Sequence, residues 1–299
     1  MRVPPMASLL QRWRTLREAA SNVLAMNRRN LGYVYPCNAR RDFPIANDKL
    51  LCKEILAPLG VPLAKTHFSY RYFYELRNLE ADLRGLEDFV IKPANGSAGN
   101  GIVVIVGREG DEWLGISGKR YTIEALRRHL SDIIFGVYSF DNTDAAIIEE
   151  RVVQHPVINA LFDRGLADVR IILYQDEPVM TMSRLPTLAS DGKANLHQGA
   201  VGLGIELESG VCRQAMLASV PVTHHPDSGA ELIGVTIPFW GEIIRHSRTI
   251  AQAVPLKYLG VDIAIGEQGP VLLEINARPG LEIQNVNRRA MRPILEAIR

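Results

Sequence analysis

The apolar positions along this chain follow two different periods. Residues 8–26 place Leu9, Trp13 and Leu16 at three- and four-residue steps, which predicts an amphipathic helix. Farther along, many short apolar runs occur in pairs that are joined by glycine-containing turns, which predicts antiparallel hairpins. Because helices alternate with hairpins and not with single parallel strands, the chain is predicted to have an α+β fold.

The predicted elements cover most of the chain. Helices are expected over 47–60, 71–86, 122–136, 238–254 and 287–299. Asn47 or Asp48 would cap the first of these and Gly60 would end it, and Thr122 would cap the third. Hairpins are expected over 88–107, 167–187 (turning at 176–178), 199–217 and 261–280, with one more strand over 145–153. Residues 1–44 then form an N-terminal helical arm, whose helix over 8–26 either packs on the protein or binds a membrane surface or a partner.

The last hairpin, Val261–Gly280, carries three polar residues among apolar ones. If its turn spans 266–270, Asp262 faces Glu274 across the two strands, and Asn276 lies on the same face. The opposite face would hold Val261, Ile263, Ile265, Val271, Leu273 and Ile275, while Ala264 and Leu272 would join the polar face. Two facing carboxylates repel, and we expect no neighbour to neutralise them, so a cation such as Mg²⁺ or Mn²⁺ would suit this face. A solvated outer face with no bound ion is the alternative interpretation.

A second candidate site follows the apolar strand 89–91. Lys92 stands at the end of this strand, and the loop after it contains Gly96, Gly99 and Gly101. Glycine lets backbone N–H groups approach a phosphate closely, and lysine adds a positive charge. The spacing matches neither a P-loop nor the dinucleotide fingerprint, and a tight hairpin turn is the alternative interpretation.

Three other polar groups are weak signals when each is taken alone. Glu149 and Glu150 end a strand, where solvated carboxylates are common. Asp168 and Arg170 share one face of a strand, as an exposed ion pair would. His197 lies in a polar loop, and an isolated loop histidine is seldom catalytic.

The composition narrows the classes of function. The chain has 299 residues, a formal net charge of +1 and 47% hydrophobic residues, which is typical of a globular protein. Balanced charge argues against a nucleic-acid surface, and no apolar run reaches the roughly 18 residues that a transmembrane helix needs. The three scattered cysteines and the lack of a secretory signal predict reduced thiols in a cytoplasmic protein.

Taken together and in order, these segments resemble the ATP-grasp superfamily, above all the ribosomal-protein-S6 glutamate ligase group and the related alpha-L-glutamate ligase-like proteins. The resemblance implies two α+β subdomains that clasp ATP between antiparallel sheets, in a domain over 45–299 with a smaller lid subdomain over about 65–150. It is carried by NDK at 47–49, VIKPANGSAGNGI at 90–102, IIEERV at 147–152, DVR at 168–170, KANLHQGA at 193–200, GVDIAI at 260–265 and LEINARPGLE at 273–282.

The resemblance also implies a role for each matching residue. The implied nucleotide-binding residues are Lys49, Lys92, Gly96, Ser97, Gly99, Gly101, Glu149, Glu150, Val152, Asp168, Lys193 and His197. Among these, the lysines would contact phosphates, Glu150 and the backbone near Val152 the adenine, and Asp168 the ribose. The implied ligands of Mg²⁺ or Mn²⁺ are Asp262, Glu274 and Asn276, and the implied catalytic residues are Arg170, Arg278 and Asn195.

The activity implied by the resemblance is ATP-dependent ligation of a carboxylate to an amine through an acyl phosphate. The substrates would be an amino acid, glutamate among them, and an amino-acid, peptide or protein acceptor. Phosphoryl transfer requires mainly positioning and neutralised charge, which agrees with the absence of an obvious Ser–His or Cys–His arrangement. The alternatives are an ATP-binding regulatory protein that holds a partner with its basic arm, and a kinase that stops at phosphotransfer.

Two departures from the glutamate ligase pattern affect the expected substrate. Only about 45 residues precede Asn47, so we expect no full N-terminal α/β domain of the kind that often helps to bind substrates in this group. Lys193 stands where the group often has arginine, which keeps the charge and loses the two-pronged guanidinium. The oligomeric state stays open.

Overall fold

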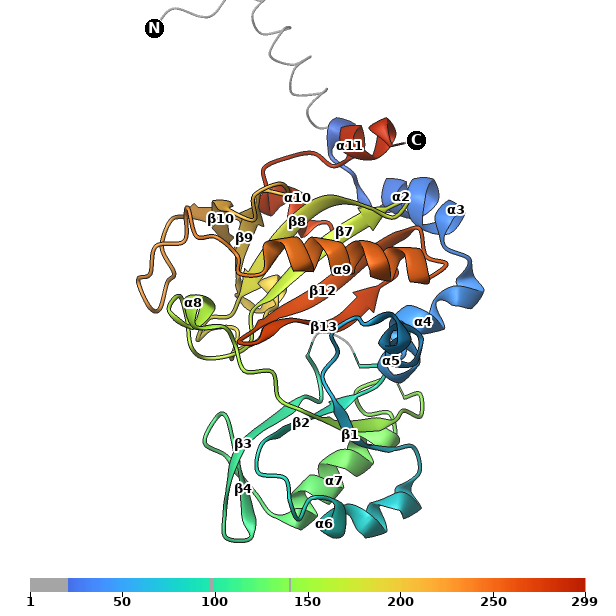
Figure 1. The fold of residues 1–299 in the computed structure, drawn as a ribbon, viewed down its shortest axis with the longest axis vertical. Coiled ribbons are helices and arrows are strands. Elements are labelled where there is room, and N and C mark those ends of the chain that lie inside the picture. Colours follow the sequence, from blue (N-terminus) through green and yellow to red (C-terminus); the bar gives the residue numbers. More distant parts are fainter. Residues whose placement is uncertain (1–20, 97–98, 140, 299) are drawn as a thin grey trace, which may run out of the picture.

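The protein has two lobes, each built around one antiparallel sheet (Figure 1). The structure is a computed structural model, and it describes residues 21–96, 99–139 and 141–298. The strand order is β1-β6-β2-β3-β4-β5 in the smaller lobe and β11-β10-β9-β8-β7-β12-β13 in the larger lobe. Two antiparallel sheets combined with helices confirm the predicted α+β fold.

The smaller lobe packs helices against one sheet. Its strands are β1 Thr66–Tyr70, β2 Phe89–Pro93, β3 Val103–Glu109, β4 Glu112–Gly115, β5 Arg120–Tyr121 and β6 Ala146–Glu149. Its helices are η4 Phe73–Asn78 (3₁₀), α6 Leu79–Asp82 and α7 Ile123–Ile134. Thr122 caps α7 as predicted, and Leu126 and Leu130 of this helix pack on Phe89 and Ile91 of the sheet. The single helix predicted over 71–86 is split in two, and its first half is rich in aromatic residues, which lose rotamer freedom in an α-helix.

The larger lobe contains a seven-stranded sheet, and helix α9 lies across one face of this sheet (Figure 1). Its strands are β7 Asp168–Tyr174, β8 Glu177–Leu185, β9 Val201–Ile205, β10 Cys212–Leu217, β11 Val220–Val222, β12 Tyr258–Gly266 and β13 Gly269–Asn276. Its helices are α8 Pro156–Asn159, η5 Leu196–Gln198 (3₁₀), α9 Trp240–Ala253, α10 Glu282–Val286 and α11 Arg292–Ala297. Ile243 and Ile250 of α9 belong to one buried cluster with Val169, Ile171 and Val261 of the sheet.

The opposite face of this sheet is partly polar and partly apolar. Side chains alternate along a strand, so Asp168, Arg170, Ile172 and Tyr174 of β7 share the face that α9 does not cover. Ile172 and Tyr174 lie in a second buried cluster with residues of the arm, of α10 and of α11. The polar residues on this face therefore border an apolar region that the arm covers.

The arm consists of short helical turns that lead into helix α5. The turns of the arm are α2 Met26–Arg29, the π-helical turn η1 Asn30–Val34, α3 Tyr35–Cys37 and η2 Arg40–Asp42 (3₁₀). They are followed by α4 Pro44–Asn47, α5 Lys49–Leu56 and η3 Ala57–Leu59 (3₁₀). Asp48 caps α5 by accepting from the Leu50 N–H at 2.8 Å, and Gly60 follows with a φ of +69°, as the sequence predicted.

Three predictions about the arm and the domain limits have different outcomes. Most of the helix predicted over 8–26 lies outside the described residues. Over the described ranges, every helix is too short or too polar to cross a bilayer. The domain limits at 44 and at about 65–150 stay predictions, although the smaller sheet spans 66–149.

The last hairpin differs from its prediction in the turn and agrees with it at the polar residues. Strand β12 ends at Gly266 and β13 begins at Gly269, so the turn over 266–270 was predicted too long. The register shifts by one residue next to Asp262, and this bulge restores the predicted pairing of Asp262 with Glu274. Nearer the turn the prediction was wrong, because Leu272 pairs with Ile263 and joins the core in place of its neighbours Val271 and Leu273.

Candidate functional site

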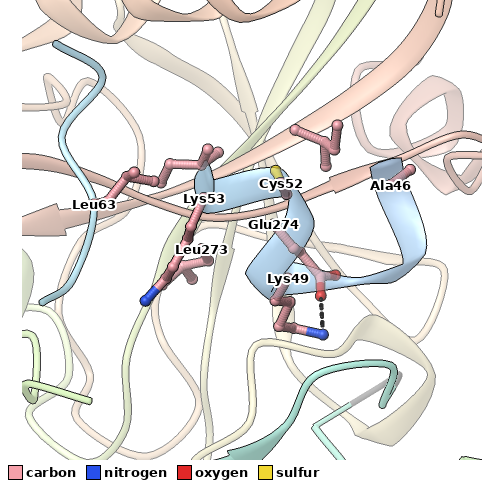
Figure 2. A pocket seen from close by; sticks show the side chains of 9 residues that line it. Ala46, Lys49, Cys52, Lys53, Leu63, Leu273 and Glu274 are labelled. Atoms are coloured by element: carbon pink, nitrogen blue, oxygen red, sulfur yellow. Dashed lines mark ion pairs between the residues drawn. The ribbon is translucent and has the colours of Figure 1, made fainter. Parts of the chain in front are cut away.

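Two lysines on helix α5 stand between the lobes. Lys49 donates to the backbone oxygen of Gly96 at 2.9 Å, and its ammonium lies 3.4 Å from the Glu274 carboxylate. Figure 2 shows Lys49 directed at Glu274 and Lys53 on the same helix, one turn farther along. Lys49 therefore joins the glycine loop of the smaller lobe to strand β13 of the larger one.

Lys53 belongs to a buried group of charges around Glu149. Its ammonium lies 2.5 Å from the Glu149 carboxylate and also donates to the backbone oxygen of Ala64 at 2.8 Å and to the Thr66 hydroxyl at 3.0 Å. Lys92 forms an ion pair with the other oxygen of Glu149. Burial alone would raise the pKa of Glu149, but the two ammonium groups lower it, so the carboxylate stays ionised.

The pairing of Lys92 with Glu149 unites two predicted nucleotide-binding residues. Burial is the main reason why the pKa of Lys92 is lowered, and Glu149 opposes this shift. Sequence reasoning missed Lys53, although its position four residues after Lys49 on a predicted helix places both on one face.

The glycine loop after β2 meets the loop that carries Lys193. Gly99 and Gly101 have φ angles of +76° and +75°, which side-chain-bearing residues rarely adopt. A Cβ built on Gly99 would lie 3.7 Å from the Lys193 Cδ, so this lysine lies against the loop. The backbone oxygen of Gly101 is 2.9 Å from the His129 Nε2, while Ser97, another predicted nucleotide contact, lies outside the described residues.

Two arginines neutralise the carboxylates on the large sheet. Arg170 donates to both oxygens of Asp262 at 2.8 and 2.5 Å. Arg184 forms an ion pair with Asp168 and donates to Asp262 at 2.9 Å. Burial would raise the pKa of Asp262, but the guanidinium groups lower it to about 2. The expectation that no neighbour neutralises Asp262 and Glu274 was therefore wrong.

Arg184 was missed because the turn of its hairpin was misplaced. A turn centred on 176–178 pairs Asp168 with Pro186, whereas the observed turn, with positive φ at Gln175 and Asp176, pairs Asp168 with Arg184. Arg184 donates to both oxygens of the buried Asp168 carboxylate, so the residue that the resemblance assigns to the ribose is already paired in this structure.

The predicted metal ligands meet on the same face of β12 and β13. The Asn276 amide donates to Asp262 at 3.2 Å and to Glu274 at 3.5 Å. Within the described residues, no cluster of three His, Cys, Asp or Glu side chains suits a metal ion, so this face offers two carboxylates and the Asn276 amide. Oxygen ligands fit Mg²⁺, and the partly exposed Glu274 and Asn276 fit best, because both oxygens of Asp262 already bind arginines.

The remaining predicted residues are Arg278, Asn195, Glu150, Val152 and His197. Arg278 is exposed, and its guanidinium lies over two aromatic rings of the arm. Asn195 caps η5 by accepting from the His197 N–H at 3.0 Å. Glu150 is exposed and Val152 half-buried on the segment that leaves β6, and among the described residues no hydrogen bond or ion pair joins the Glu150 or His197 side chain to the charged groups above.

Comparison with known proteins places this arrangement in a family. The model of the family described as sugar-transfer associated ATP-grasp matches residues 28–299. A probable alpha-L-glutamate ligase of Cellvibrio japonicus (strain Ueda107) is 27% identical over 239 residues, which are 79% of this chain and 57% of that protein. The ribosomal protein bS6–L-glutamate ligase of Escherichia coli O1:K1 / APEC is 24% identical over 249 residues, 83% of this chain and 61% of that protein.

A solved structure has a similar fold. The D-alanine-D-alanine ligase of Helicobacter pylori matches with a TM-score of 0.50 and 13% identity, over 84% of this chain and 60% of that chain. This chain spans about three fifths of the length of the curated relatives named above. The family model covers far more than half of the chain and agrees with the resemblance of its motifs, so the protein belongs to the sugar-transfer associated ATP-grasp family.

Proposed function

We propose that the protein is an ATP-dependent ligase that joins a carboxylate to an amine. The observation that carries this proposal is the convergence of charged groups from separate segments between the two sheets. Lys49 from α5, Lys92 from β2 and Lys193 from the loop before η5 lie on or beside the glycine loop or its strand, and Glu274 lies within 3.4 Å of Lys49. A polyphosphate needs such a group of cations, together with a glycine-rich backbone.

The proposed reaction has two steps. A carboxylate oxygen of the first substrate bonds to the γ-phosphorus of ATP, the bond from that phosphorus to the bridging oxygen breaks, and ADP leaves. The amine nitrogen of the second substrate then bonds to the acyl carbon, the bond to the phosphate oxygen breaks, and phosphate leaves as the nitrogen loses a proton. No protein nucleophile takes part, so the chain has to position the reactants and neutralise charge.

Each charged group has a role in this scheme. Lys49 and Lys92 bind phosphate oxygens, while Arg170 and Arg278 face the transferred phosphoryl group or the substrate carboxylate. Glu274 and Asn276, with Asp262 once Arg170 releases an oxygen, would hold Mg²⁺. When bound, Mg²⁺ neutralises charge on the phosphates of ATP. Asp262 keeps Arg170 at the sheet surface until substrate arrives.

The names of the relatives support the proposed substrate classes. The Escherichia coli relative is named for joining L-glutamate to a ribosomal protein, and the Cellvibrio relative for glutamate ligation. We therefore propose an amino acid as the amine and a carboxylate of an amino acid, peptide or protein as the acceptor, in the cytoplasm. Because the family description names sugar transfer, acids of the uronic class belong among the carboxylates to be tested.

Turnover is the first test of this function. The full chain is incubated with ATP, Mg²⁺ and a panel of amino acids, peptides and uronic acids, and the release of ADP and phosphate is measured. We expect release that requires both a carboxylate and an amine, together with an amide product in the mass spectrum. ATP binding without turnover on every pair would contradict the proposal and favour a regulatory ATP-binding protein.

Lys92→Ala is expected to weaken ATP binding about tenfold or more, the loss typical of one hydrogen bond to a charged group. Glu149 keeps its ion pair with Lys53 in this variant, so the fold should persist. The dissociation constant of ATP is measured by calorimetry, with Lys119→Ala, an exposed lysine of the same lobe, as the matched control. Equal affinity of the Lys92 variant and the wild type would show that Lys92 does not contact the nucleotide.

A further inference from the structure

The arm contacts three consecutive residues of the loop that follows the polar strand β13. Asn38 donates to the backbone oxygen of Ala277 at 3.2 Å, and Arg29 donates to that of Pro279 at 2.7 Å. Between these two, the guanidinium of Arg278 lies over rings of the arm. Residues near the start of the described chain therefore contact each of the residues 277, 278 and 279 near the end of the chain.

Arg29 is a buried arginine held by neutral acceptors. Besides the Pro279 oxygen, its guanidinium donates to the side-chain oxygen of Asn30 at 3.0 and 2.8 Å. Only 8% of the residue is exposed, and among the described residues no carboxylate lies within ion-pair distance. Burial is the main reason why the pKa of Arg29 is lowered; Tyr258 opposes this shift, and the nearby charge of Arg278 adds to it. Buried charges are usually paired with an opposite charge, and Arg29 has no such partner within residues 21–96, 99–139 and 141–298.

Asn38 ties the same loop to the start of strand β12. Its amide nitrogen donates to the backbone oxygen of Tyr258 at 2.7 Å, and its side-chain oxygen accepts from the Tyr258 N–H at 3.1 Å. The residue is 2% exposed, so these bonds are shielded from water. Ala277 therefore has a fixed position relative to the sheet that carries Asp262 and Arg170.

The Arg278 guanidinium lies on aromatic rings of the arm and is open to solvent. Its guanidinium carbon is 4.9 Å from the ring centre of Phe43 and 5.8 Å from that of Tyr35. The side chain is exposed, and within the described part of the chain it forms no ion pair. A Cβ built on Gly280 would lie 3.9 Å from the Arg170 guanidinium, so the loop 277–280 also borders the second predicted catalytic arginine.

We propose that Arg29, Asn38 and Phe43 of the arm are positioning residues, which hold the loop 277–280 and the guanidinium of Arg278 in place for the carboxylate substrate. This inference rests on the proposed ligase function and names the side of the site at which the carboxylate enters. A free arginine side chain has many rotamers, so holding it on aromatic rings reduces the conformational freedom that substrate binding must restrict. Cation–π contact also leaves the N–H groups at the guanidinium edge free for a carboxylate.

The variants Arg29→Met and Phe43→Leu test this arm contact. Phe43→Leu keeps an apolar side chain against both buried clusters of the large lobe, so this variant should stay folded. It therefore still tests the contact if Arg29→Met fails to fold. Arg28→Met, an exposed arginine of the same turn, and Tyr74→Leu, an exposed ring of the smaller lobe, are the matched controls. Thermal unfolding establishes that each variant is folded.

The first readout is hydrogen exchange at the amides of residues 277, 278, 280 and 281 in the free protein, since Pro279 has no amide hydrogen. This readout needs no turnover. We expect protection in Arg29→Met to fall about tenfold or more, as the loss of one hydrogen bond from a charged donor predicts, with a smaller fall in Phe43→Leu. The controls should match the wild type. Unchanged protection in both test variants would overturn the arm's role, whatever the protein catalyses.

The second readout separates positioning from general stability. With a carboxylate and amine that give turnover, we expect KM for the carboxylate to rise in both variants, while KM for ATP stays within about twofold of the wild type, because the lysines that bind ATP lie elsewhere. An equal change in both KM values, or no change in either, would show that the arm is only structural. Absence of turnover in the wild type would instead refute the ligase function and leave the exchange result standing.

Discussion

Replacing Glu274 by glutamine is expected to lower Mg²⁺-dependent turnover at least about 100-fold while the protein stays folded. Charge neutralisation by a metal ion contributes several kcal/mol to a transition state, and each 1.4 kcal/mol is about a factor of ten. The substitution keeps the size of the side chain and lies on the polar face, so the core partners Leu272 and Ile275 of the same strand are untouched. Turnover is measured against Mg²⁺ concentration, and folding by thermal unfolding.

Glu267→Gln is the matched control for this substitution. Glu267 is exposed in the turn between β12 and β13, so its loss of charge should change neither turnover nor stability. The ion pair of Glu274 with Lys49 is partly exposed and is worth at most about 1 kcal/mol. Global unfolding of the Glu274 variant would mean that this carboxylate is structural, and normal turnover would exclude it as a metal ligand.

Arg184→Met is expected to cost about 3–5 kcal/mol of unfolding free energy, the usual loss when one partner of a buried ion pair is removed. Asp262 keeps Arg170, but Asp168 loses the guanidinium that holds both of its oxygens, and 3% exposure leaves it little access to water. Most of the loss therefore arises at Asp168. Urea unfolding at neutral pH measures it.

A second substitution locates the origin of this loss. In the double variant Arg184→Met with Asp168→Asn, the unpaired charge is gone, so we expect more than half of the lost stability to return. Arg213→Met, which breaks an exposed pair with Glu206, should cost at most about 1 kcal/mol. If Arg184→Met costs as little, or if the double variant recovers no stability, the loss does not come from an unpaired, buried Asp168 carboxylate.

The sequence predicted features that depend on short-range order. Strand alternation and one glycine-containing turn were enough to place Asp262 opposite Glu274. The turn was predicted too long and the bulge was not predicted, and these two errors compensate each other. The caps Asp48 and Thr122 were also correct, because a cap is a bond to an N–H two or three residues away.

Contacts between distant segments could not be read from the residue pattern of any one segment. Arg184 was missed because a shift of the hairpin turn changes every facing pair, and Lys53 because its partner Glu149 lies 96 residues away. The contacts of the arm with the loop 277–280 join residues that are 239 and 250 positions apart. No periodicity within one segment reports such contacts, since they depend on how the lobes and the arm pack.

Transfer of oxygen from the carboxylate substrate to phosphate tests the ligase proposal most directly. A carboxylate that supports turnover is labelled with ¹⁸O at both oxygens, and the phosphate formed with ATP, Mg²⁺ and the amine is analysed by mass spectrometry. Attack of the carboxylate on the γ-phosphorus predicts one ¹⁸O in each phosphate released. Phosphate without the label would show that water attacks ATP, and would contradict an acyl phosphate at this site.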